Sequence, residues 1–420
     1  MSAKAKNNSA SVKKTKNNPT PIKIRPIDIV AVILLTMFAF STRLFNLGLP
    51  QEYYFDEIYY VEAAKSYKQL KKDPNWVHPP LAKILIAQGS ILSSKDFFRW
   101  RIAGLLLGCL MIPLVYFLAF YMFKSTLASS LAAFFLSIDF LHFAQSRIAT
   151  LDIFLAFFML VSAFFLWFSI NKKEFDIIYF YLSAVFSGLA CACKWSGIFS
   201  VFFAVAIVLL YHRKSFFKNI FIYILLLLIT YFITYIPYFF IGGTVQGLYK
   251  LFVNTLKFQY KGDWTHHYMS PLWKWPLLLR PIWYFYEKME NARCSGIIAF
   301  GNPLFWYPFF VFFAVSVYRA IFLRVKEDCF LALGYIFSFI FWIFSNRGGF
   351  FYYMTPAVVW MTLITVGYLS KIKLNPFGKV FLYGYIAFVF FAFCVYYPYM
   401  TAIPMPSKSL HLLFFMRFWI

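Results

Sequence analysis

Eleven long apolar segments follow one another through most of this chain and limit the folds open to it. Each has about 17–25 residues, the length that an α-helix needs to cross the hydrocarbon core of a bilayer. We predict spans at 28–47, 100–123, 127–146, 151–170, 177–193, 196–211, 217–240, 303–323, 329–345, 349–369 and 380–399. Of the 420 residues, 62% are hydrophobic and only 13% are charged. A soluble domain cannot bury so much apolar surface, so we predict an all-α, multi-pass integral membrane protein.

The distribution of basic residues predicts an orientation in the membrane. The formal net charge of +24 is spread between the apolar segments, which is typical of topology signals and lipid contact rather than of nucleic-acid binding. The short loops on the side of the amino terminus contain Lys124, Lys172, Lys173, Arg213, Lys214, Lys218, Arg319, Arg324, Lys326, Lys371, Lys373 and Lys379. The short loops on the other side contain only Arg147, Lys194 and Arg347. By the positive-inside rule the amino terminus is cytoplasmic, and the carboxyl-terminal residues 398–420 lie outside.

The chain divides into a tail and one membrane domain. Residues 1–27 are rich in Lys, Asn and Ser and are expected to form a basic, disordered cytoplasmic tail, whereas 28–420 form a single integral membrane domain. The first apolar segment has no small-residue cleavage site after it, so no cleavable signal peptide is expected. Six cysteines show no disulfide or metal pattern, and the pair His266-His267 lacks the spacing of a metal site. We therefore predict no metal.

Two large loops remain on the outer side. The first, about 48–99, is polar and charged, and its segments Asp56–Leu70 and Pro80–Ser93 are expected to be helical. The second, about 241–302, is rich in Trp, Tyr and Pro. Its segment Gln246–Tyr260 has the amphipathic spacing of a helix that lies in the plane of the lipid headgroups. The outer loops are the places where chemistry is expected.

Ionisable residues of both signs gather at the outer edge of the predicted spans. The positions are Asp56, Arg101, Arg147, Asp152, Lys194, Arg280 and Arg347. Ionisable groups at the membrane edge are costly to keep and are therefore functional candidates. Two acids among several bases suit an anionic phosphate ligand that has a proton to be removed nearby. Packing alone explains any one of these residues equally well, for example by an ion pair between Asp152 and Arg147.

The adjacent carboxylates Asp56 and Glu57 are the most unusual pair in the first loop. Neighbouring side chains on a helix point about 100° apart, so only one of the two can face a given substrate atom. His78, which precedes two prolines, is explained either by a kink in the loop or by a supporting role at the site. The aromatic residues of 264–286 predict an interfacial belt, with stacking of Trp273 or Trp275 on a sugar ring as the alternative.

At these residues the sequence resembles the protein O-mannosyltransferase family (glycosyltransferase family 39), whose members are membrane enzymes that use polyprenyl (dolichyl) phosphate mannose. The matching motifs are Phe55-Asp56-Glu57, HPPLAK (His78 to Lys83), QSRIATLD (Gln145 to Asp152), CKWSGIF (Cys193 to Phe199), HYMSPLWKWPLLLRPIWYF (His267 to Phe285) and GNPLFW (Gly301 to Trp306). Arg101, seven residues before Gly108, also fits the family pattern. Each motif alone is weak, but their order and spacing together are specific.

The resemblance implies a GT-C type fold of about 11 transmembrane helices, with the active site under the first outer loop. It implies transfer of mannose, with inversion, from polyprenyl phosphate mannose to Ser or Thr hydroxyls of exported proteins. The first acid of the Asp-Glu pair is the family's catalytic base, which is Asp56 here. Glu57, His78 and Asp152 are expected to support it. The expected phosphate-binding residues are Arg101 and Lys194 from the family pattern, and Arg147 and Arg280 from their position at the outer edge.

Two departures from the family pattern stand out. The second loop is too short for the carbohydrate-binding-like domain of the eukaryotic members, so the chain is similar to the bacterial type, in a bacterial cell membrane. The family pattern YHYLP is here Tyr352-Tyr353-Met354-Thr355-Pro356, with Tyr353 in place of a His. We assign Tyr353, together with Trp273 and Trp275, to contacts with the acceptor or the sugar.

Two other functions remain open from the sequence. One is a related transferase that moves a lipid-linked sugar to a lipid or glycan, as the aminoarabinose transferases of lipid A do. The other is a transporter or flippase, but transporters place ionisable groups at mid-membrane in two similar halves. In this sequence the charges lie at the outer edge and no halves repeat. The lipid-linked donor that the resemblance implies agrees with the absence of a Gly-rich phosphate loop from the sequence, and no further cofactor is expected.

The topology can be tested by cysteine labelling. A cysteine introduced as Asn75→Cys in the first large loop should react with a membrane-impermeant maleimide added to intact cells, above the level of the parent chain. The matched variant Lys124→Cys should react only after the cells are opened, because the positive-inside rule puts Lys124 in the cytoplasm. Labelling of Asn75→Cys only in opened cells would overturn the topology and the position of the site together.

Overall fold

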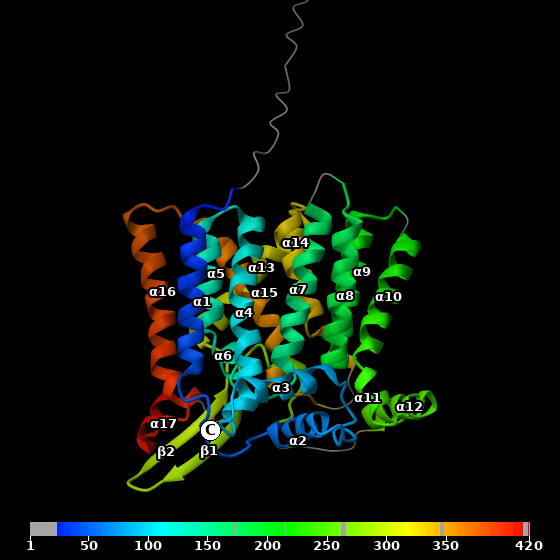
Figure 1. The fold of residues 1–420 in the computed structure, drawn as a ribbon. Coiled ribbons are helices and arrows are strands. Elements are labelled where there is room, and N and C mark those ends of the chain that lie inside the picture. The colour runs from blue at the N-terminus through cyan, green and yellow to red at the C-terminus, as the bar shows by residue number, and fades with distance from the viewer. Residues whose placement is uncertain are drawn as a thin grey trace, which may run out of the picture.

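The computed structural model describes residues 23–171, 174–214, 216–261, 266–344, 348–414 and 419. Most of them form helices that stand side by side, with the start of α1 at one end and a layer of loops, short helices and strands at the other (Figure 1). The upright helices are α1 (Pro26–Leu44), α4 (Phe98–Phe123), α5 (Thr126–Ile138), α7 (Asp152–Asn171), α8 (Ile177–Cys193), α9 (Phe199–Tyr211), α10 (Phe216–Ile233), α13 (Pro303–Ile321), α14 (Lys326–Phe337), α15 (Thr355–Leu369) and α16 (Pro376–Tyr396). The predicted helical membrane architecture is confirmed.

Each predicted span overlaps one upright helix, although α5, α10, α14 and α15 are shorter than the spans predicted at 127–146, 217–240, 329–345 and 349–369. Within the described part of the chain, seven helices are long and apolar enough to cross a membrane by length and composition, while α5, α8 and α9 are shorter apolar helices. Two of the short helices, α5 and α9, lie in predicted spans that are interrupted, whereas α8 fills its predicted span of 177–193. The span at 127–146 divides into α5 and α6 (Phe140–Gln145), and the span at 196–211 begins with the 3₁₀ turn Trp195–Ile198. Eleven crossings therefore remain a prediction.

Polar side chains start several of these helices. The residues just before α5, α6, α8, α13 and α16 accept hydrogen bonds from backbone N–H groups of the first turn through their own side chains: Ser125, Asp139, Asp176, Asn302 and Asn375. Such caps satisfy donors that a helix start leaves without partners, and they are favoured in these residue types. The cap at Asp139 explains why the predicted third span breaks in two.

The helices predicted in the outer loops are present. The first loop contains α2 (Glu57–Lys68) and α3 (Leu81–Leu92), and the second contains α12 (Val245–Lys261) after the short α11 (Ile236–Phe240). Both α2 and α12 lie nearly flat across the ends of the upright helices (Figure 1). On α12, Leu248 and Thr255 are buried, whereas Val245, Tyr249 and Leu256 are exposed. The amphipathic spacing read from the sequence thus becomes a helix with one buried side.

A small antiparallel sheet, formed by the second outer loop and a short strand near the carboxyl terminus, was not predicted. Its strands are β1 (Ile282–Met289), β2 (Arg293–Ala299) and β3 (Met405–Pro406), in the order β1-β2-β3. Ile282 pairs with Ala299, and the register shifts between Trp283 and Phe285. Branched and aromatic residues favour strands. Aromatic residues are also typical of a membrane interface, which is why the sequence of 264–286 predicted an interfacial belt. The sheet projects from the outer end of the helices (Figure 1).

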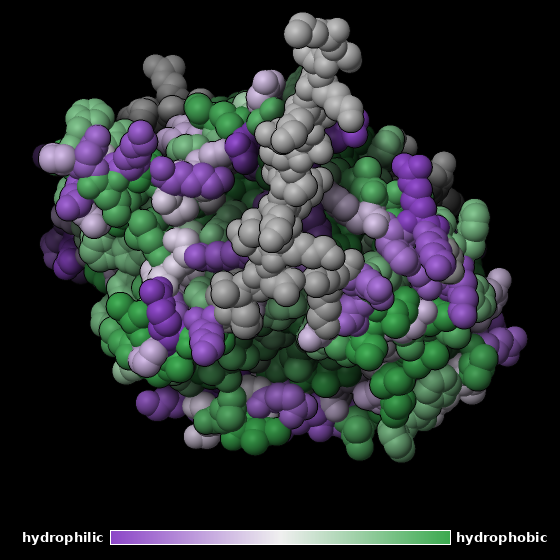
Figure 2. Space-filling model, turned by 90° about the horizontal axis from the view of Figure 1, so that it is seen from above, coloured by the Kyte–Doolittle hydropathy of each residue, from purple (hydrophilic) through white to green (hydrophobic). Residues whose placement is uncertain are grey.

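The opposite end of the molecule, where α1 begins, presents many basic side chains. Lys124, Arg213, Lys214, Lys371 and Lys373 are all exposed in its connections. Figure 2 views this end and shows hydrophilic residues spread over it among hydrophobic ones. Residues 1–22 of the predicted tail, Lys172, Lys173 and Arg347 lie outside the described residues. The charge asymmetry that favours a cytoplasmic position for this end therefore holds in the structure for the loops that can be placed.

Candidate active site

Asp56 lies where the first outer loop turns into α2, at the outer end of the upright helices. The preceding residue, Phe55, has a left-handed backbone with φ of 52°. Its ring packs on Tyr284 and Tyr352, with centroids 4.8 and 5.8 Å away. The Tyr352 hydroxyl donates to Oδ2 of Asp56 at 3.1 Å. The Asp56 carboxylate is half-buried among aromatic rings and is oriented by a residue from the far end of the chain.

Glu57 turns the other way and forms a buried ion pair with Arg101, the predicted phosphate ligand at the start of α4. Nε and Nη2 of Arg101 donate to Oε1 and Oε2 of Glu57, each at 2.9 Å. Oε1 of Glu57 also accepts from the backbone N–H of Ala149 at 2.9 Å. The remaining N–H groups of Arg101 donate to the carbonyl oxygens of Leu47, Pro50 and Glu52. As the helix geometry predicted, the two adjacent carboxylates face different partners.

This geometry bears on the role of Arg101. A guanidinium has five N–H donors, and in Arg101 all five reach acceptors of the chain itself. Phosphate binding by Arg101 stays a prediction, and it would require one of these bonds to be exchanged. The contacts favour a positioning role: Arg101 holds the segment before Asp56 and the residue after it.

Lys194 and Asp152 form the second buried ion pair. Nζ of Lys194 donates to Oδ1 of Asp152 at 2.8 Å. The same ammonium lies 4.0 Å from the ring centroid of Tyr353 and 5.4 Å from that of Tyr352. Since Tyr352 also bonds Asp56, the structure brings Asp56, Asp152, Lys194 and Tyr353 together. A cation held in this way is suited to a phosphate that arrives beside Asp56.

The pairing of Asp152 with Arg147 that the sequence allowed is wrong. Arg147 is buried and donates to the carbonyl oxygens of Arg43 and Phe45, the latter at 2.6 Å, while Asp152 takes Lys194. The reason is the turn between α6 and α7, which directs the two side chains to different neighbours. Arg280 lies farther out in the second loop, where it donates to the carbonyl of His267 at 2.5 Å. Phosphate contacts by Arg147 and Arg280 remain predictions.

The environment of Asp56 changes its acidity. Burial raises the pKa of the Asp56 carboxyl to about 6, partly offset by the hydrogen bond from Tyr352 and the charge of Lys194, and reinforced by the charge of Asp152. A group with this pKa is still mostly ionised near neutral pH, and it is a stronger base than an ordinary aspartate. The raised value fits a proton acceptor.

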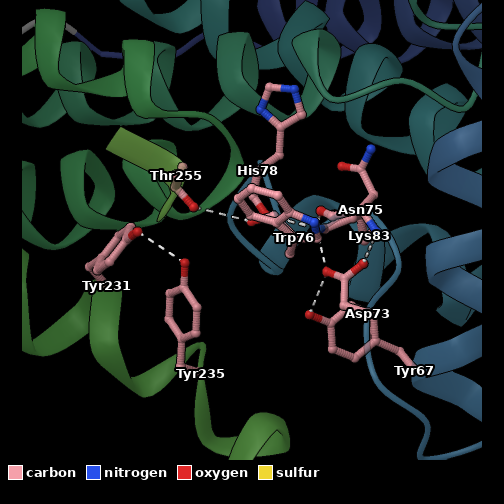
Figure 3. A network of polar contacts seen from close by, with 9 residues as sticks. All are labelled: Tyr67, Asp73, Asn75, Trp76, His78, Lys83, Tyr231, Tyr235 and Thr255. Carbon is pink, nitrogen blue, oxygen red and sulfur yellow. Dashed lines mark hydrogen bonds and ion pairs between the residues drawn. The ribbon is translucent and has the colours of Figure 1, made fainter. Parts of the chain in front are cut away.

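His78 and Lys83 belong to the part of the first outer loop that leads into α3. Nζ of Lys83 is buried and donates to Asp73, to the carbonyl of Asn75 at 2.6 Å and to the carbonyl of His78 at 2.7 Å (Figure 3). The His78 ring lies 5.9 Å from that of Tyr60. In this geometry the HPPLAK motif joins the loop to α3. The catalytic support predicted for His78 remains a prediction.

The aromatic residues assigned to sugar or acceptor contacts occupy different environments. Trp273 is 59% exposed, whereas Trp275 is 1% exposed and donates through Nε1 to Ser270 at 3.1 Å. Tyr353 stacks on Trp342 with centroids 4.4 Å apart and lies under Lys194. Trp273 is accessible from outside, Trp275 belongs to the packed interior, and Tyr353 lies beside the ion pair.

Three residues near Asp56 were not singled out from the sequence. Tyr352 bonds the Asp56 carboxylate, Gln145 donates to the Tyr284 hydroxyl at 2.6 Å, and Thr150 donates to Gln145 at 2.9 Å. All three lie within or beside motifs that the sequence already highlighted. Nothing local distinguishes them from other aromatic or amide residues, because their importance comes from their partners.

Two adjoining narrow crevices lead from this cluster between the helices. One lies beside Asp152 and Tyr353, and the other lies between α7, α9, α14 and α15. Both are lined by Met159, Phe199, Ser338 and Pro356. The crevice between the helices is lined mainly by apolar side chains. The site therefore has a seam that runs from its ion pair toward the level of the membrane interior.

Comparison with known proteins identifies the family. A family model described as dolichyl-phosphate-mannose-protein mannosyltransferase matches residues 33–100 and 89–245, about half of the chain. The chain belongs to this family. It is similar to the polyprenol-phosphate-mannose–protein mannosyltransferases of Mycolicibacterium smegmatis (24% identical, 92% of each chain covered) and Mycobacterium tuberculosis (25% identical, 92% of this chain and 91% of the relative). The family resemblance read from the motifs is confirmed.

Solved structures of low identity share the fold. The Saccharomyces cerevisiae protein O-mannosyltransferase Pmt1-Pmt2 complex, bound to its sugar donor, aligns with a TM-score of 0.79 at 13% identity, over 94% of this chain and 93% of that one. ArnT from Cupriavidus metallidurans, bound to undecaprenyl phosphate, aligns with a TM-score of 0.60 at 14% identity, over 92% and 75%. The predicted GT-C type fold is confirmed.

The substitution Arg101→Lys separates the two roles of Arg101. Lysine offers a point charge and cannot form the bidentate pair together with three carbonyl contacts. If Arg101 positions the loop, thermal stability in detergent and kcat should both fall, with the KM for the lipid donor little changed. The matched control Arg99→Lys, on the same helix and paired with the exposed Asp96, should change neither. Unchanged stability with a raised donor KM would instead support phosphate binding.

Proposed function

We propose that this chain is a polyprenyl-phosphate-mannose–protein mannosyltransferase, which transfers mannose with inversion to Ser or Thr hydroxyls of exported proteins. The observation that carries the proposal is the Asp56 carboxylate of raised pKa, next to the Lys194–Asp152 pair. Both lie at the outer end of the helices of a chain that belongs to this family. The similar mycobacterial proteins are named for this activity, and the alignment with this chain covers nearly their whole length.

Asp56 acts as the general base. The acceptor oxygen attacks the anomeric carbon, the bond from that carbon to the phosphate oxygen breaks, and the electron pair leaves with the lipid phosphate. The proton of the acceptor hydroxyl passes to the Asp56 carboxylate. General base catalysis of this kind contributes about 10²–10⁴-fold. Attack from the side opposite the phosphate, with no covalent intermediate, inverts the anomeric centre.

Lys194 stabilises the leaving phosphate. Its ammonium is buried and held by Asp152, so little reorganisation is needed when negative charge develops on the phosphate. In such a low-dielectric setting a fixed cation acts more strongly than it would in water. Asp152 and Tyr353 orient this cation, and Arg101 with Glu57 positions the loop that holds Asp56.

The donor enters from the membrane and the acceptor from outside. The crevices between α7, α9, α14 and α15 are apolar but too narrow to hold a prenyl chain, so these helices must separate if the chain enters here while its phosphate reaches Lys194. Residues 28–420 then work as one catalytic domain in the cell membrane. Residues 1–27 form a cytoplasmic tail, and the site lies on the outer face.

Transfer can be measured directly on membranes that contain this chain. With radiolabelled polyprenyl phosphate mannose, label should move to protein, and Asp56→Asn should lower the transfer rate by about two to four orders of magnitude because the amide cannot accept the proton. Donor binding should persist. The matched control Asp96→Asn, an exposed acid of the same loop, should retain full activity. Label that moves only to lipid or glycan would indicate the related lipid-linked-sugar transferase, and label that stays on the donor would refute both.

The pH profile should report Asp56. The base must be ionised, so kcat/KM should fall as pH decreases through about 6, the pKa of Asp56. The hydrogen bond from Tyr352 lowers that pKa, so Tyr352→Phe should move the profile to higher pH. Tyr59→Phe, an exposed tyrosine on α2, is the control and should leave the profile in place. A profile that stays unchanged in Tyr352→Phe would exclude Asp56 as the titrating base.

A further inference from the structure

A second cavity, of about 330 Å³, opens at the outer end of the molecule, apart from the crevices beside Lys194. The first outer loop forms one wall, and the end of α10 with α11 and α12 forms the other. Its lining is Tyr67, Lys72, Asp73, Trp76, His78, Pro80, Tyr235, Tyr238, Ile241, Gly242, Gly243, Thr244 and Leu251. This volume lies within the range of small-ligand sites. Neither the family motifs nor the proposed mechanism assigns this cavity a role.

The wall formed by the first loop is rigid and electrically balanced. Asp73 accepts hydrogen bonds from the Tyr67 hydroxyl at 3.0 Å and from the backbone N–H of Asn75 at 2.8 Å, and it pairs with buried Lys83 (Figure 3). The charge of Asp73 is therefore neutralised from within the wall. What this wall presents to the cavity is mainly the rings of Tyr67, Trp76 and His78.

The opposite wall adds further rings. Tyr235 and Tyr238 line it, and the Tyr235 hydroxyl bonds that of Tyr231 at 3.1 Å (Figure 3). A Cβ at Gly243 would lie 2.2 Å from the Tyr238 ring, so only glycine lets this ring lie so close to the turn. The ring of Trp76 meets Phe258 of α12 edge-on, with centroids 6.0 Å apart. The two walls thus contact each other and form a preshaped aromatic cavity.

The cavity lies one layer of side chains away from Asp56. His78, which lines it, packs against Tyr60, and the backbone N–H of Tyr60 donates to the carbonyl of Asp56 at 3.3 Å. On the other side, Tyr231 accepts from Nε1 of Trp195, the residue after Lys194. An extended chain advances about 3.3–3.6 Å per residue. A side chain that enters the cavity therefore belongs to a residue close in sequence to the hydroxyl at Asp56.

We propose that this cavity binds an uncharged, ring-bearing side chain, aromatic or proline, of the acceptor polypeptide near the modified hydroxyl. The proposal rests on the proposed function and adds a determinant of acceptor choice. Aromatic walls suit rings of this kind, which pack against them face to face or edge to face. A lipid phosphate would require cations, but Asp73 and Lys83 neutralise each other and the exposed Lys72 is the one other charged residue of the described lining.

Two synthetic peptides test the proposal. They share one Thr and differ only in whether the residues within about four positions of it include Tyr and Pro or only Gly and Ala. The parent chain should prefer the ring-bearing peptide by about three- to tenfold in KM. Leu251→Trp should fill the cavity and abolish that preference, with the KM for polyprenyl phosphate mannose unchanged. Leu256→Trp, on the exposed side of the same helix, is the matched control and should retain the preference.

The outcomes separate this inference from the proposed function. An equal loss for both peptides in Leu251→Trp, or a raised donor KM, would overturn the acceptor cavity. Transfer to neither peptide by the parent chain, together with no label on any protein, would refute the proposed function instead. If only mannosylated peptides showed the preference, the cavity would bind a sugar and not a side chain. That result would overturn the proposal.

Cross-linking decides the matter if Leu251→Trp does not fold. A benzoylphenylalanine introduced at Trp76, inside the cavity, should capture the ring-bearing peptide under light. The same probe at Tyr249, exposed on α12, should not. Capture that is equal at the two positions, or capture of the lipid donor at Trp76, would contradict the proposal.

Discussion

The ion pair between Arg101 and Glu57 is the interaction on which the arrangement of the site depends. The chain leaves α1 and runs over the outer end of the helices, and the Arg101 guanidinium binds three of its carbonyl oxygens while it holds Glu57 through both oxygens. Removal of either member of a buried pair leaves an uncompensated charge and costs about 3–5 kcal/mol. The fold thus keeps the loop in one conformation, and Asp56 takes its position from that loop.

The ion pairs of Glu57 and Asp152 determine which charges act on Asp56. Glu57 takes Arg101 and Asp152 takes Lys194, so within the described part of the chain Asp56 has the hydrogen bond from Tyr352 and, at longer range, the charges of Lys194 and Asp152. Burial raises the pKa of Asp56, and no cation of the described residues forms an ion pair with its carboxylate. The proposed base, Asp56, and the proposed phosphate-binding cation, Lys194, are thereby kept from pairing directly, since Lys194 is already bonded to Asp152.

The proposed donor and acceptor sites lie on two sides of the first outer loop. The crevices between the upright helices are apolar but narrow, and the aromatic cavity is the proposed place for a side chain of the acceptor. The first outer loop forms one wall of that cavity and also contains Asp56, with Lys83 joining the loop to α3. If the cavity binds the acceptor as proposed, this one segment positions both the acceptor and the proposed base.

The sequence by itself determined the helical membrane architecture, the loop helices and the family, because apolar periodicity and motif order are local properties of the chain. It also indicated that Asp56 and Glu57 could not share one partner. Only the tertiary structure decided which partners they take: Glu57 and Arg101 are 44 residues apart, and Asp56 and Tyr352 are 296 residues apart. The same holds for Lys194 as the partner of Asp152, and for the small sheet, whose aromatic residues suit a strand and a membrane interface equally. The ion-pair partners and the strand register depend on which distant segments pack together in the fold. The sequence around each residue does not record that choice.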